Sequence, residues 1–311
     1  MSRIPIKVAL FVAQPTVALP SLNLLTQKGQ LAGVVLPSQN DPVLNQFAHS
    51  LIQQQIPYAK LQFGQEHYVV DQLNQWQCDA IVAMGFSGDV PEVLQQATEF
   101  GYFNLLLTDP RYYAGMVPLY WQLRQGETKG QATIQHVTCK DEFSIVAQQD
   151  YDLAPLDTYS RVENKASNAA AKCLDYFLQQ SVSAGKLATN FVSLSTEQKF
   201  PAPDEQMLRV NFAKMKGKRV VDMARAGNPV FNGCVIQLGQ TPLSLLQATL
   251  VDLPTYGVRP GTICYSGGAN GLIVAVLDGA LRLDVIANSD GIFSAAAFVE
   301  RFQIHAGMTF T

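Results

Sequence analysis

The cysteines and one glycine-rich run are the parts of this sequence with residue types suited to holding a metal ion or a phosphate. The run at residues 266–271 (SGGANG) does not open a helical pattern, so it predicts a hairpin turn rather than a phosphate loop. The five cysteines are scattered and form no C-x-x-C pair: Cys78, Cys139, Cys173, Cys234 and Cys264. This spacing predicts no zinc site and no disulfide framework, and we expect no metal cofactor.

Histidine is the other residue type suited to catalysis at neutral pH. His136 lies in the apolar run ATIQHV, where strand alternation places it on the opposite face from Gln135 and Val137. It is either a packed strand residue, which is the more common case, or a catalytic imidazole. His49, His67 and His305 are far from any candidate site, and we assign them no role.

Basic residues gather at the start of the last hundred residues: Lys214, Lys216, Lys218, Arg219 and Arg225. They form either a contact for a polyanion or a solvated helix face. The chain has 22 basic and 25 acidic residues, a net charge of −3, which excludes a globally basic nucleic-acid-binding protein and favours the solvated face.

The elements that must position any site read as two domains. Of 311 residues, 48% are apolar and 15% charged, which is enough for ordinary cores. Short apolar runs alternate with amphipathic stretches in the first half, with strands expected at residues 7–13, 31–36, 80–84, 101–107 and 132–137. Helices are expected at residues 20–29, 43–54 and 164–180. This alternation predicts a doubly wound α/β sheet, whose ligands bind beyond the carboxyl ends of the strands.

The last hundred residues change character. A short helix is expected at residues 216–226, followed by strands punctuated by glycines, which predict a small antiparallel β-barrel. We therefore expect a Rossmann-like domain over residues 1–181, a linker over 182–203 and an OB-like barrel over 204–311. The first residues lack a signal-peptide pattern and no apolar run approaches the ~20 residues of a spanning helix, so a cytoplasmic protein is expected.

The order of motifs along nearly the whole chain resembles that of the methionyl-tRNA formyltransferase family. The family pattern GTPxFAxPSL corresponds to AQPTVALPSL at residues 13–22, and GxxNLHxSLLPxxRGAxP corresponds to GYFNLLLTDPRYYAGMVP at 101–118. The segment GDxxTGVTIMxMDxGLDTG corresponds to GETKGQATIQHVTCKDEFS at 126–144. Further matches are LRVNFAKMKGKRVVDMARAGNPVFNGCV at 208–235, PGTIC at 260–264, DGALRLDVI at 278–286 and FSAAAFVERF at 293–302.

The resemblance implies transfer of a formyl group from 10-formyltetrahydrofolate to an amine, with an Asn, a His and an Asp around the formyl carbon. Asn104 stands at the place of the Asn, Thr108 at that of a nearby Ser, and Glu142, with Asp141 beside it, at that of the Asp. Leu106 stands where the family has its histidine, and leucine cannot exchange a proton. The glycine-rich turn around the Asp has also lost its two glycines, which changes the expected loop backbone.

The resemblance places the folate against the loop after the strand at residues 80–84, at Met84, Phe86, Ser87, Gly88 and Val90. Asp89 stands there where the family has an apolar residue, so the usual folate pose is doubtful although a pocket is expected.

The family's long basic insertion, which grips acceptor-stem RNA, is replaced by PSQNDPVLNQ at residues 37–46, which has no basic residue. Specific binding of initiator tRNA is therefore not expected. The sequence favours a divergent formyltransferase-like protein that acts on, or binds, a small-molecule or carrier-bound amine. The alternatives are a pseudoenzyme that keeps the pocket and, less favoured, a true methionyl-tRNA formyltransferase with a compensating base such as His136.

Overall fold

The computed structural model describes residues 5–86, 90–139, 142–184, 192–194 and 199–311. Contacts divide the chain into two compact units. The first contains residues 1–116, 129–152 and 163–199, and the second contains 117–128, 153–162 and 200–311. Each unit is described by itself below.

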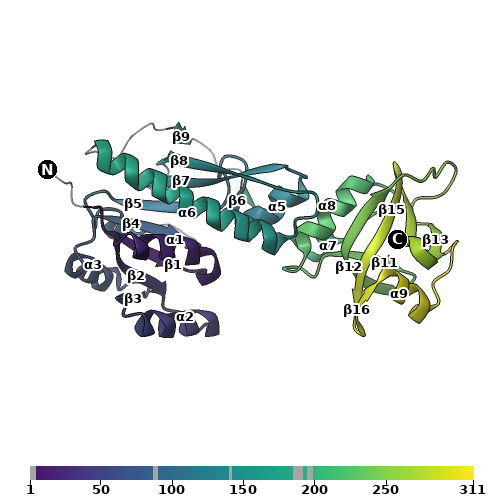
Figure 1. Ribbon diagram of the computed structural model, residues 1–311, viewed down its shortest axis with the longest axis horizontal. Coiled ribbons are helices and arrows are strands. Elements are labelled where there is room, and N and C mark those ends of the chain that lie inside the picture. Colours follow the sequence, from purple (N-terminus) through teal and green to yellow (C-terminus); the bar gives the residue numbers. More distant parts are fainter. Residues whose placement is uncertain (1–4, 87–89, 140–141, 185–191, 195–198) are drawn as a thin grey trace. The chain divides into compact units, whose positions relative to one another are not determined.

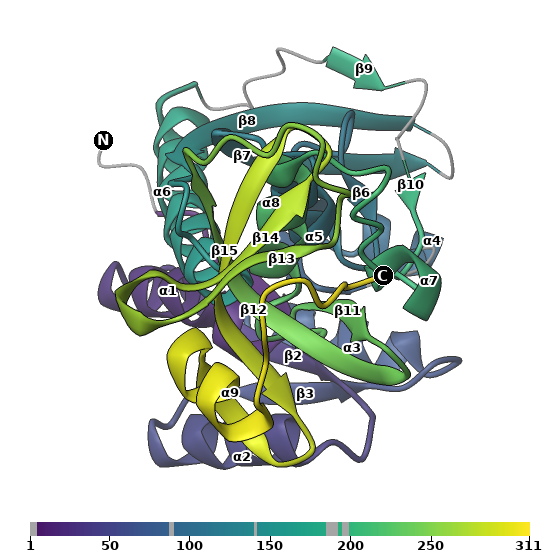
Figure 2. The same cartoon turned by 90° about the vertical axis from the view of Figure 1, so that its right-hand side faces the viewer.

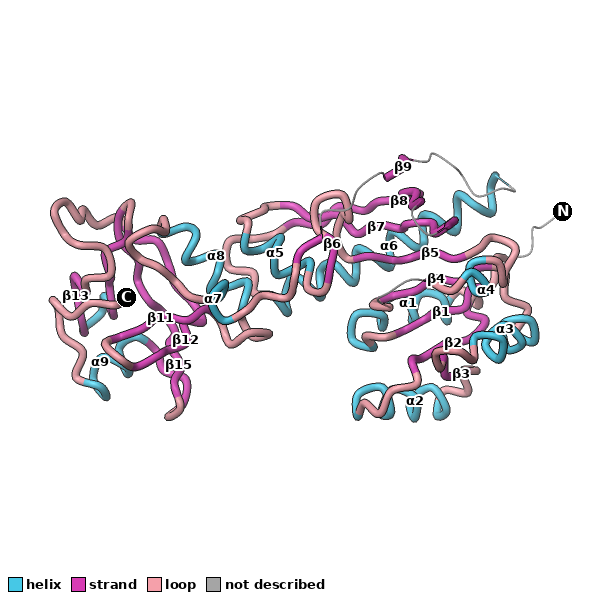
Figure 3. Tube along the Cα trace, turned by 180° about the vertical axis from the view of Figure 1, so that it is seen from behind, coloured by secondary structure: helices cyan, strands magenta, loops and turns pink. Residues whose placement is uncertain are grey.

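An eight-stranded sheet forms the first unit, in the order β3-β2-β1-β4-β5-β7-β8-β9. Most of this order can be followed across the sheet in Figure 3. The bounds are β1 Val8–Val12, β2 Leu31–Pro37, β3 Tyr58–Leu61, β4 Ala80–Met84, β5 Tyr102–Leu106, β7 Lys129–Cys139, β8 Glu142–Asp152 and β9 Val192–Leu194. A further short strand, β6, spans Ala114–Gly115. The first five strands of the order pair in parallel, and β7, β8 and β9 extend the sheet in antiparallel fashion.

Helices cover both faces of this sheet because its central strands are apolar on both sides. Every residue of β1 and β4 is buried. On one face, α3 (Glu66–Gln75) and α4 (Glu92–Gln95) pack over Phe11, Ile81 and Tyr102. Figure 1 shows α1 (Pro15–Gln27) and α6 (Tyr159–Ala184) in front of the opposite face, and α2 (Pro42–Gln53) lies below α1.

The sequence predicted most of these elements but missed some. The strand at residues 80–84 is confirmed residue for residue, and the predicted helix at 43–54 is α2. Helix α1 begins at Pro15, five residues before the prediction, because proline fits the first turn of a helix. Strand β3, helix α3 and strand β8 were not predicted, since their mixed polar sequences carry no clear apolar run.

The second unit is built on an antiparallel sheet in the order β11-β12-β15-β14-β13, with β16 paired to β15. The strands are β11 Cys234–Leu238, β12 Thr241–Val251, β13 Ile263–Gly267, β14 Gly271–Val276, β15 Gly279–Asn288 and β16 Gly291–Ser294. A short 3-10 helix, Gly268–Asn270, joins β13 to β14, so the SGGANG run is a turn as predicted. The helices are α5 Pro118–Arg124, α7 Glu205–Leu208, α8 Gly217–Gly227 and α9 Ala295–Phe302.

The last residues of the chain connect the two edges of this sheet. Phe310 bridges to Leu238 at the end of β11, and Thr309 bridges to Thr262 just before β13. The backbone N–H of Phe310 donates to the carbonyl of Gly261 at 2.8 Å, and that of Thr311 donates to Gln237 at 2.9 Å. Figure 2 shows this C-terminal segment running beside β13 and β11. The predicted fold class, a Rossmann-like α/β domain followed by a small antiparallel β-domain, is confirmed.

The predicted domains are continuous stretches of sequence, whereas each of the two compact units contains several separate stretches. Helix α5, the segment 153–162 and the start of α6 belong to the second unit, although they lie within the predicted first domain. Within the predicted linker, the described residues form the end of α6, β9 and β10 (Lys199–Phe200). Among the described residues, no helix combines the length and apolarity needed to span a membrane.

Candidate functional site

Asn104 lies near the carboxyl end of β5, in the interior of the eight-stranded sheet. Alternation places it on the same face as Tyr102 and Leu106, the face that α3 and α4 cover further back. Its neighbours in the sheet are Ala83 on β4 and Gln135 on β7. Asn104 and Leu106 are both half-buried, so this part of the face is partly open.

Next to Asn104 the sheet changes from apolar to polar. On β7, Gln131, Thr133 and Gln135 alternate along the face that carries Asn104, and Thr133 lies directly opposite Leu106. Gln148 on β8 pairs with Thr133, and its Nε2 donates to Thr133 Oγ1 at 3.2 Å and to Gln131 Oε1 at 3.4 Å. Buried polar side chains of this kind need hydrogen-bond partners, and Gln148 supplies them to Thr133 and Gln131.

The loop after β5 folds over this polar row. Asp109, 4% exposed, accepts from Arg111 Nη2 at 2.5 Å, from Arg111 Nε at 3.0 Å, and from Gln148 Nε2 at 3.1 Å. Arg111 Nη2 also donates to Gln148 Oε1 at 3.2 Å. Burial alone would raise the pKa of Asp109, but the hydrogen bonds from Arg111 and Gln148 outweigh it and lower the pKa.

Sequence reasoning did not single out this aspartate–arginine pair. The signal available was the Asp-Pro-Arg triplet directly after a buried strand, at the sheet edge where ligands bind. In the motif comparison, Asp109 and Arg111 occupy positions where the family pattern has Leu and Pro.

Thr108, predicted as a site residue, is 2% exposed, and its Oγ1 donates to the carbonyl of Tyr113 at 2.8 Å. Its hydroxyl therefore holds the loop after β5 in shape. This contact positions the segment that carries Asp109 and Arg111.

The structure does not bring Glu142 to Asn104. Glu142 is the first residue of β8 and pairs with Cys139, four residues beyond the Gln135 that faces Asn104. At about 3.3 Å a residue, its backbone lies roughly 13 Å further along the sheet, toward the amino end of β5. Residues 142–144, which correspond to the last three positions of the family's glycine-rich turn, are strand here. Asp141 lies outside the described residues.

His136 lies on the face away from Asn104, as alternation predicted. Its ring stacks on Phe103 at 4.7 Å between centroids and 20° between planes, and Phe103 packs in turn on Phe177 of α6. Burial lowers the pKa of His136, which favours the neutral imidazole. The alternative in which His136 replaces the missing catalytic base is therefore not supported, because the side chains of His136 and Asn104 lie on opposite faces of the sheet.

A pocket of about 460 Å³ opens beyond the carboxyl ends of β2, β3 and β4. Its lining includes Phe86 and Val90, two of the predicted folate-binding residues. The remaining lining residues are Pro37, Ser38, Gln39, Leu61, Gln62, Phe63, Glu66, Pro91, Leu94 and Tyr102. Met84, also predicted to bind folate, is fully buried in β4 and does not line the pocket, and Ser87 and Gly88 lie outside the described residues.

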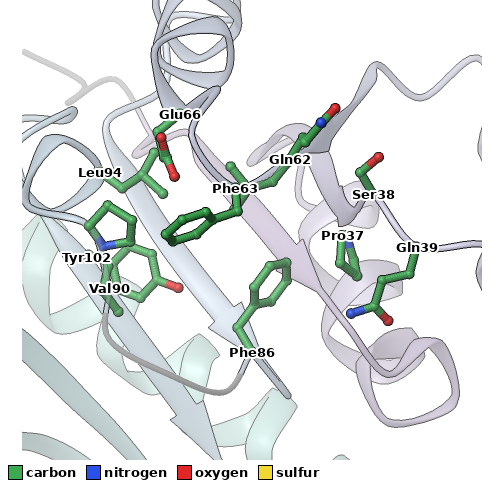
Figure 4. Close-up of a pocket in the computed structure, with 12 residues that line it drawn as sticks. Pro37, Ser38, Gln39, Gln62, Phe63, Glu66, Phe86, Val90, Leu94 and Tyr102 are labelled. Atoms are coloured by element: carbon green, nitrogen blue, oxygen red, sulfur yellow. The ribbon is translucent and has the colours of Figure 1, made fainter.

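Aromatic rings and one carboxylate dominate this pocket. Figure 4 shows the rings of Phe63 and Phe86 entering it from two different loops, with the ring of Tyr102 also in the lining. Phe63 is 94% exposed, so its ring is available to a ligand, whereas Phe86 is backed by Phe11 at 5.7 Å. Glu66 accepts from the backbone N–H of Gly64 at 2.9 Å, and this bond lowers its pKa and keeps it an acceptor. Such a lining suits a planar heteroaromatic ring with N–H donors on its edge.

The predicted basic cluster in the second unit contains both buried and exposed residues. Arg225 is buried, and its Nη2 lies 2.8 Å from Asp222, whereas Lys214 and Lys216 are exposed. Neither the polyanion contact nor the solvated face describes the whole cluster, because its most buried cation is already paired. In the part of the chain that the structure describes, no three His, Cys, Asp or Glu side chains lie together as metal ligands.

Comparison with known proteins finds the formyl transferase C-terminal domain model over residues 204–303. The methionyl-tRNA formyltransferase of Rickettsia rickettsii (strain Iowa) is 25% identical over 177 residues, 53% of this chain and 57% of that protein. The matched region thus spans little more than half the length of these relatives. The methionyl-tRNA formyltransferase of Geobacillus sp. (strain WCH70) is 30% identical over 118 residues, 38% of this chain and 37% of that protein.

Solved structures share the fold at lower identity. HypX from Aquifex aeolicus, in complex with tetrahydrofolic acid, has a TM-score of 0.60 and 12% identity, covering 97% of this chain and 48% of that chain. The N-formyltransferase from Helicobacter canadensis, in complex with folinic acid and dTDP-3-aminofucose, has a TM-score of 0.61 and 15% identity, covering 89% of this chain and 98% of that chain.

Proposed function

The chain is a divergent member of the formyltransferase family, and from this premise we propose that it binds a formylated reduced folate together with a small-molecule or carrier-bound amine. The observation that carries the proposal is the position of Asn104. It lies on one face of the sheet between the aromatic pocket, which Tyr102 lines two residues earlier, and the polar row on β7.

The pocket fits the planar ring of a folate. Phe63 and Phe86 offer ring faces for stacking, and Glu66 offers an acceptor to an N–H edge. Asp89, whose charge made the usual pose doubtful, lies outside the described residues. When bound, the folate supplies the one-carbon group, and every other contribution comes from side chains of this protein.

Asn104 is the residue proposed to act on the one-carbon group. Its side-chain amide can donate to a carbonyl oxygen and stabilise the negative charge that develops there when an amine attacks. Leu106, the next residue on this face, cannot take a proton from the amine. Because a positioned acid–base group contributes typically about 10²–10⁴-fold, formyl transfer by this chain is expected to be slow.

A second candidate is a binding protein without transfer activity, and one arrangement favours it. The leucine at position 106 is accompanied by the displacement of the Glu142 backbone from Asn104. Among the described residues, the site therefore lacks the family's imidazole, and the backbone of Glu142 lies away from it. A protein with these two changes keeps a pocket and one polarising amide, which suffice for binding.

The acceptor is proposed to be a small or carrier-bound amine rather than initiator tRNA. The β2–α2 connection, Ser38 to Asp41, contains no lysine or arginine to neutralise phosphates. The Helicobacter canadensis N-formyltransferase is solved in complex with dTDP-3-aminofucose, an amino sugar attached to a nucleotide, and an amine of this smaller size is the kind of acceptor we propose here.

Calorimetric titration with folinic acid tests the proposal. We expect saturable binding by the wild type and binding about tenfold or more weaker in Phe86→Ala, because stacking of a heterocycle on an aromatic side chain contributes about 1–3 kcal/mol. Tyr176→Ala, which removes a half-exposed ring from α6 on the other side of the sheet, is the matched control and should bind normally. Absence of binding, or equal binding by Phe86→Ala, would refute the folate assignment.

A transfer assay separates the two candidates. Neither predicts formylation of methionyl-tRNA from 10-formyltetrahydrofolate at a rate near that of the family. The enzyme candidate predicts slow formylation of an amino-sugar nucleotide that Asn104→Ala abolishes, and the binding-protein candidate predicts none. Fast formylation of methionyl-tRNA by the unaltered protein would contradict both.

A further inference from the structure

The Asp109–Arg111 pair in the loop after β5 is not explained by loop packing alone. Asp109 is buried and fully engaged, whereas the side chain of Arg111 is 32% exposed. Three nitrogens of Arg111 donate hydrogen bonds. The backbone N–H donates to Asp109 at 3.0 Å, Nε donates to Asp109, and Nη2 donates to Gln148. Within the described ranges of the chain, Nη1 of Arg111 has no hydrogen-bond partner.

The surroundings hold the guanidinium in one orientation. Its Nε and Nη2 both donate to Asp109, and Gln148 ties both members of the pair to β8. The guanidinium carbon lies 5.7 Å from the centre of the Tyr112 ring, and Tyr112 is 58% exposed. A guanidinium held this way loses little conformational freedom on binding, and its outer edge matches the oxygens of a phosphate or carboxylate.

The position of the pair relates it to Asn104. Gln148 lies two strands across from Leu106, which is about 10 Å, and Asn104 lies two residues back along β5, which is about 7 Å. All of these side chains project from the same face. A single small molecule can therefore reach both Asn104 and Arg111.

We propose that Arg111 binds the anionic group of the amine, so that the acceptor of this protein is an amine carrying a phosphate or carboxylate. The statement that the ligand is an amine rests on the proposed function. The anion site itself is inferred from the contacts of Arg111 alone. Asp109 and Gln148 are positioning residues, which hold the guanidinium without touching the ligand.

An alternative is that the Asp109–Arg111 pair has a purely structural role and only fixes the loop to β8. A purely structural ion pair needs no exposed donor on the cation, whereas the side chain of Arg111 is partly exposed beside the exposed Tyr112. The structural role also predicts that removing the guanidinium changes the stability of the protein but not its ligand binding. This difference separates the two explanations.

The test is a titration with three defined probes: inorganic pyrophosphate, glucosamine 6-phosphate and glucosaminate, with glucosamine, which has no anionic group, as the reference. We expect saturable binding of at least one of the three anions, and binding about 10- to 100-fold weaker in Arg111→Gln, because a charge-assisted hydrogen bond is lost. Arg111→Lys, which keeps the charge but not the fork, should fall between. Preference for the phosphate or the carboxylate probe identifies the anionic group.

Lys172→Gln, which removes an exposed cation from α6, is the matched control and should bind like the wild type. Thermal unfolding of each variant shows whether the loop change has unfolded the protein, and Arg111→Lys keeps the test valid if Arg111→Gln has. The proposal is wrong if no anion binds, or if the anions bind Arg111→Gln as well as the wild type. Folinic acid binding, measured in the same samples, reports on the proposed function separately.

Discussion

Two buried aspartates, one in each unit, hold an arginine and differ in how much of that arginine they leave exposed. In the second unit, Asp222 pairs with Arg225, whose side chain is 9% exposed and also donates to the carbonyls of Ala154 and Leu123. In the first unit, Asp109 pairs with Arg111, which keeps a solvent-facing edge. The same ion-pair chemistry thus yields a structural tie in one place and a candidate ligand site in the other, and the difference lies in the remaining donors of the cation.

Removal of the buried arginine should have the largest effect. Arg225→Ala leaves the buried Asp222 paired with Lys218, whose Nζ lies 2.7 Å away and whose side chain is largely exposed, so we expect a loss of about 3–5 kcal/mol in unfolding free energy. Chemical denaturation measures it. The control is Arg209→Ala in the same unit, which breaks the exposed pair with Glu205 and should cost less than about 1 kcal/mol. Equal losses in the two variants would show that the burial of Arg225 does not matter.

Asp109→Asn should cost less, about 1–3 kcal/mol, because Arg111 can be solvated when its partner loses charge. The pKa of Asp109 is lowered in the folded protein, so its contribution is present above the ordinary carboxyl pKa of about 4 and is lost as the pH falls below that value. The difference in stability between wild type and variant should therefore shrink toward pH 2. Asp71→Asn, on the exposed face of α3, should show neither effect. A difference that stays constant with pH would contradict the assignment.

His136 tests the opposite face of the site. Because burial lowers its pKa, the unfolded chain binds a proton more readily, and stability should decrease as the pH falls below about 6.5, by at most about 1.4 kcal/mol per pH unit. His136→Gln should flatten this dependence between pH 5 and 7, and the exposed His49→Gln should not. If His136→Gln abolished ligand binding without unfolding, its placement away from the site would be wrong.

Leu106→His should have the smallest effect, with no measurable gain in formyl transfer. The new imidazole would lie on the face of Asn104 and Thr133, but the backbone of Glu142, the expected carboxylate partner, begins β8 toward the other end of β5. The assay compares this variant with one that also carries the family's Gly-Leu-Asp-Thr-Gly segment in place of residues 140–144. Full activity in Leu106→His alone would show that the carboxylate is not needed.

The sequence predicted the parts of the fold that follow from apolar periodicity. Strands β1, β2 and β4 are continuous apolar runs, and α2 has a clear apolar face, so their positions could be read directly. Strand β8 could not, because Gln148, Gln149 and Asp150 make it look like a loop. In the structure Gln148 has hydrogen-bond partners in the sheet and in the loop after β5, which a linear pattern cannot show. Segments 117–128 and 153–162 joined the second unit through tertiary contacts that a linear reading of the chain cannot contain.

The candidate site was predicted in part. The motif comparison found Asn104, Phe86 and Val90, which the structure places on the open face and in the pocket. It could not find Phe63 or Arg111, since Phe63 belongs to a loop without a motif and Arg111 departs from the family pattern. It also placed Glu142 beside Asn104 by analogy, where the hairpin register puts it about 13 Å further along the sheet.

A crystal structure of the protein grown with folinic acid and pyrophosphate tests the central claim most directly. We expect the pterin ring against Phe63 and Phe86, its formyl group directed toward Asn104, and pyrophosphate oxygens within hydrogen-bond distance of Nη1 of Arg111. Folinic acid bound elsewhere on the protein, or an anion held by other cations while Arg111 remains bare, would contradict the account.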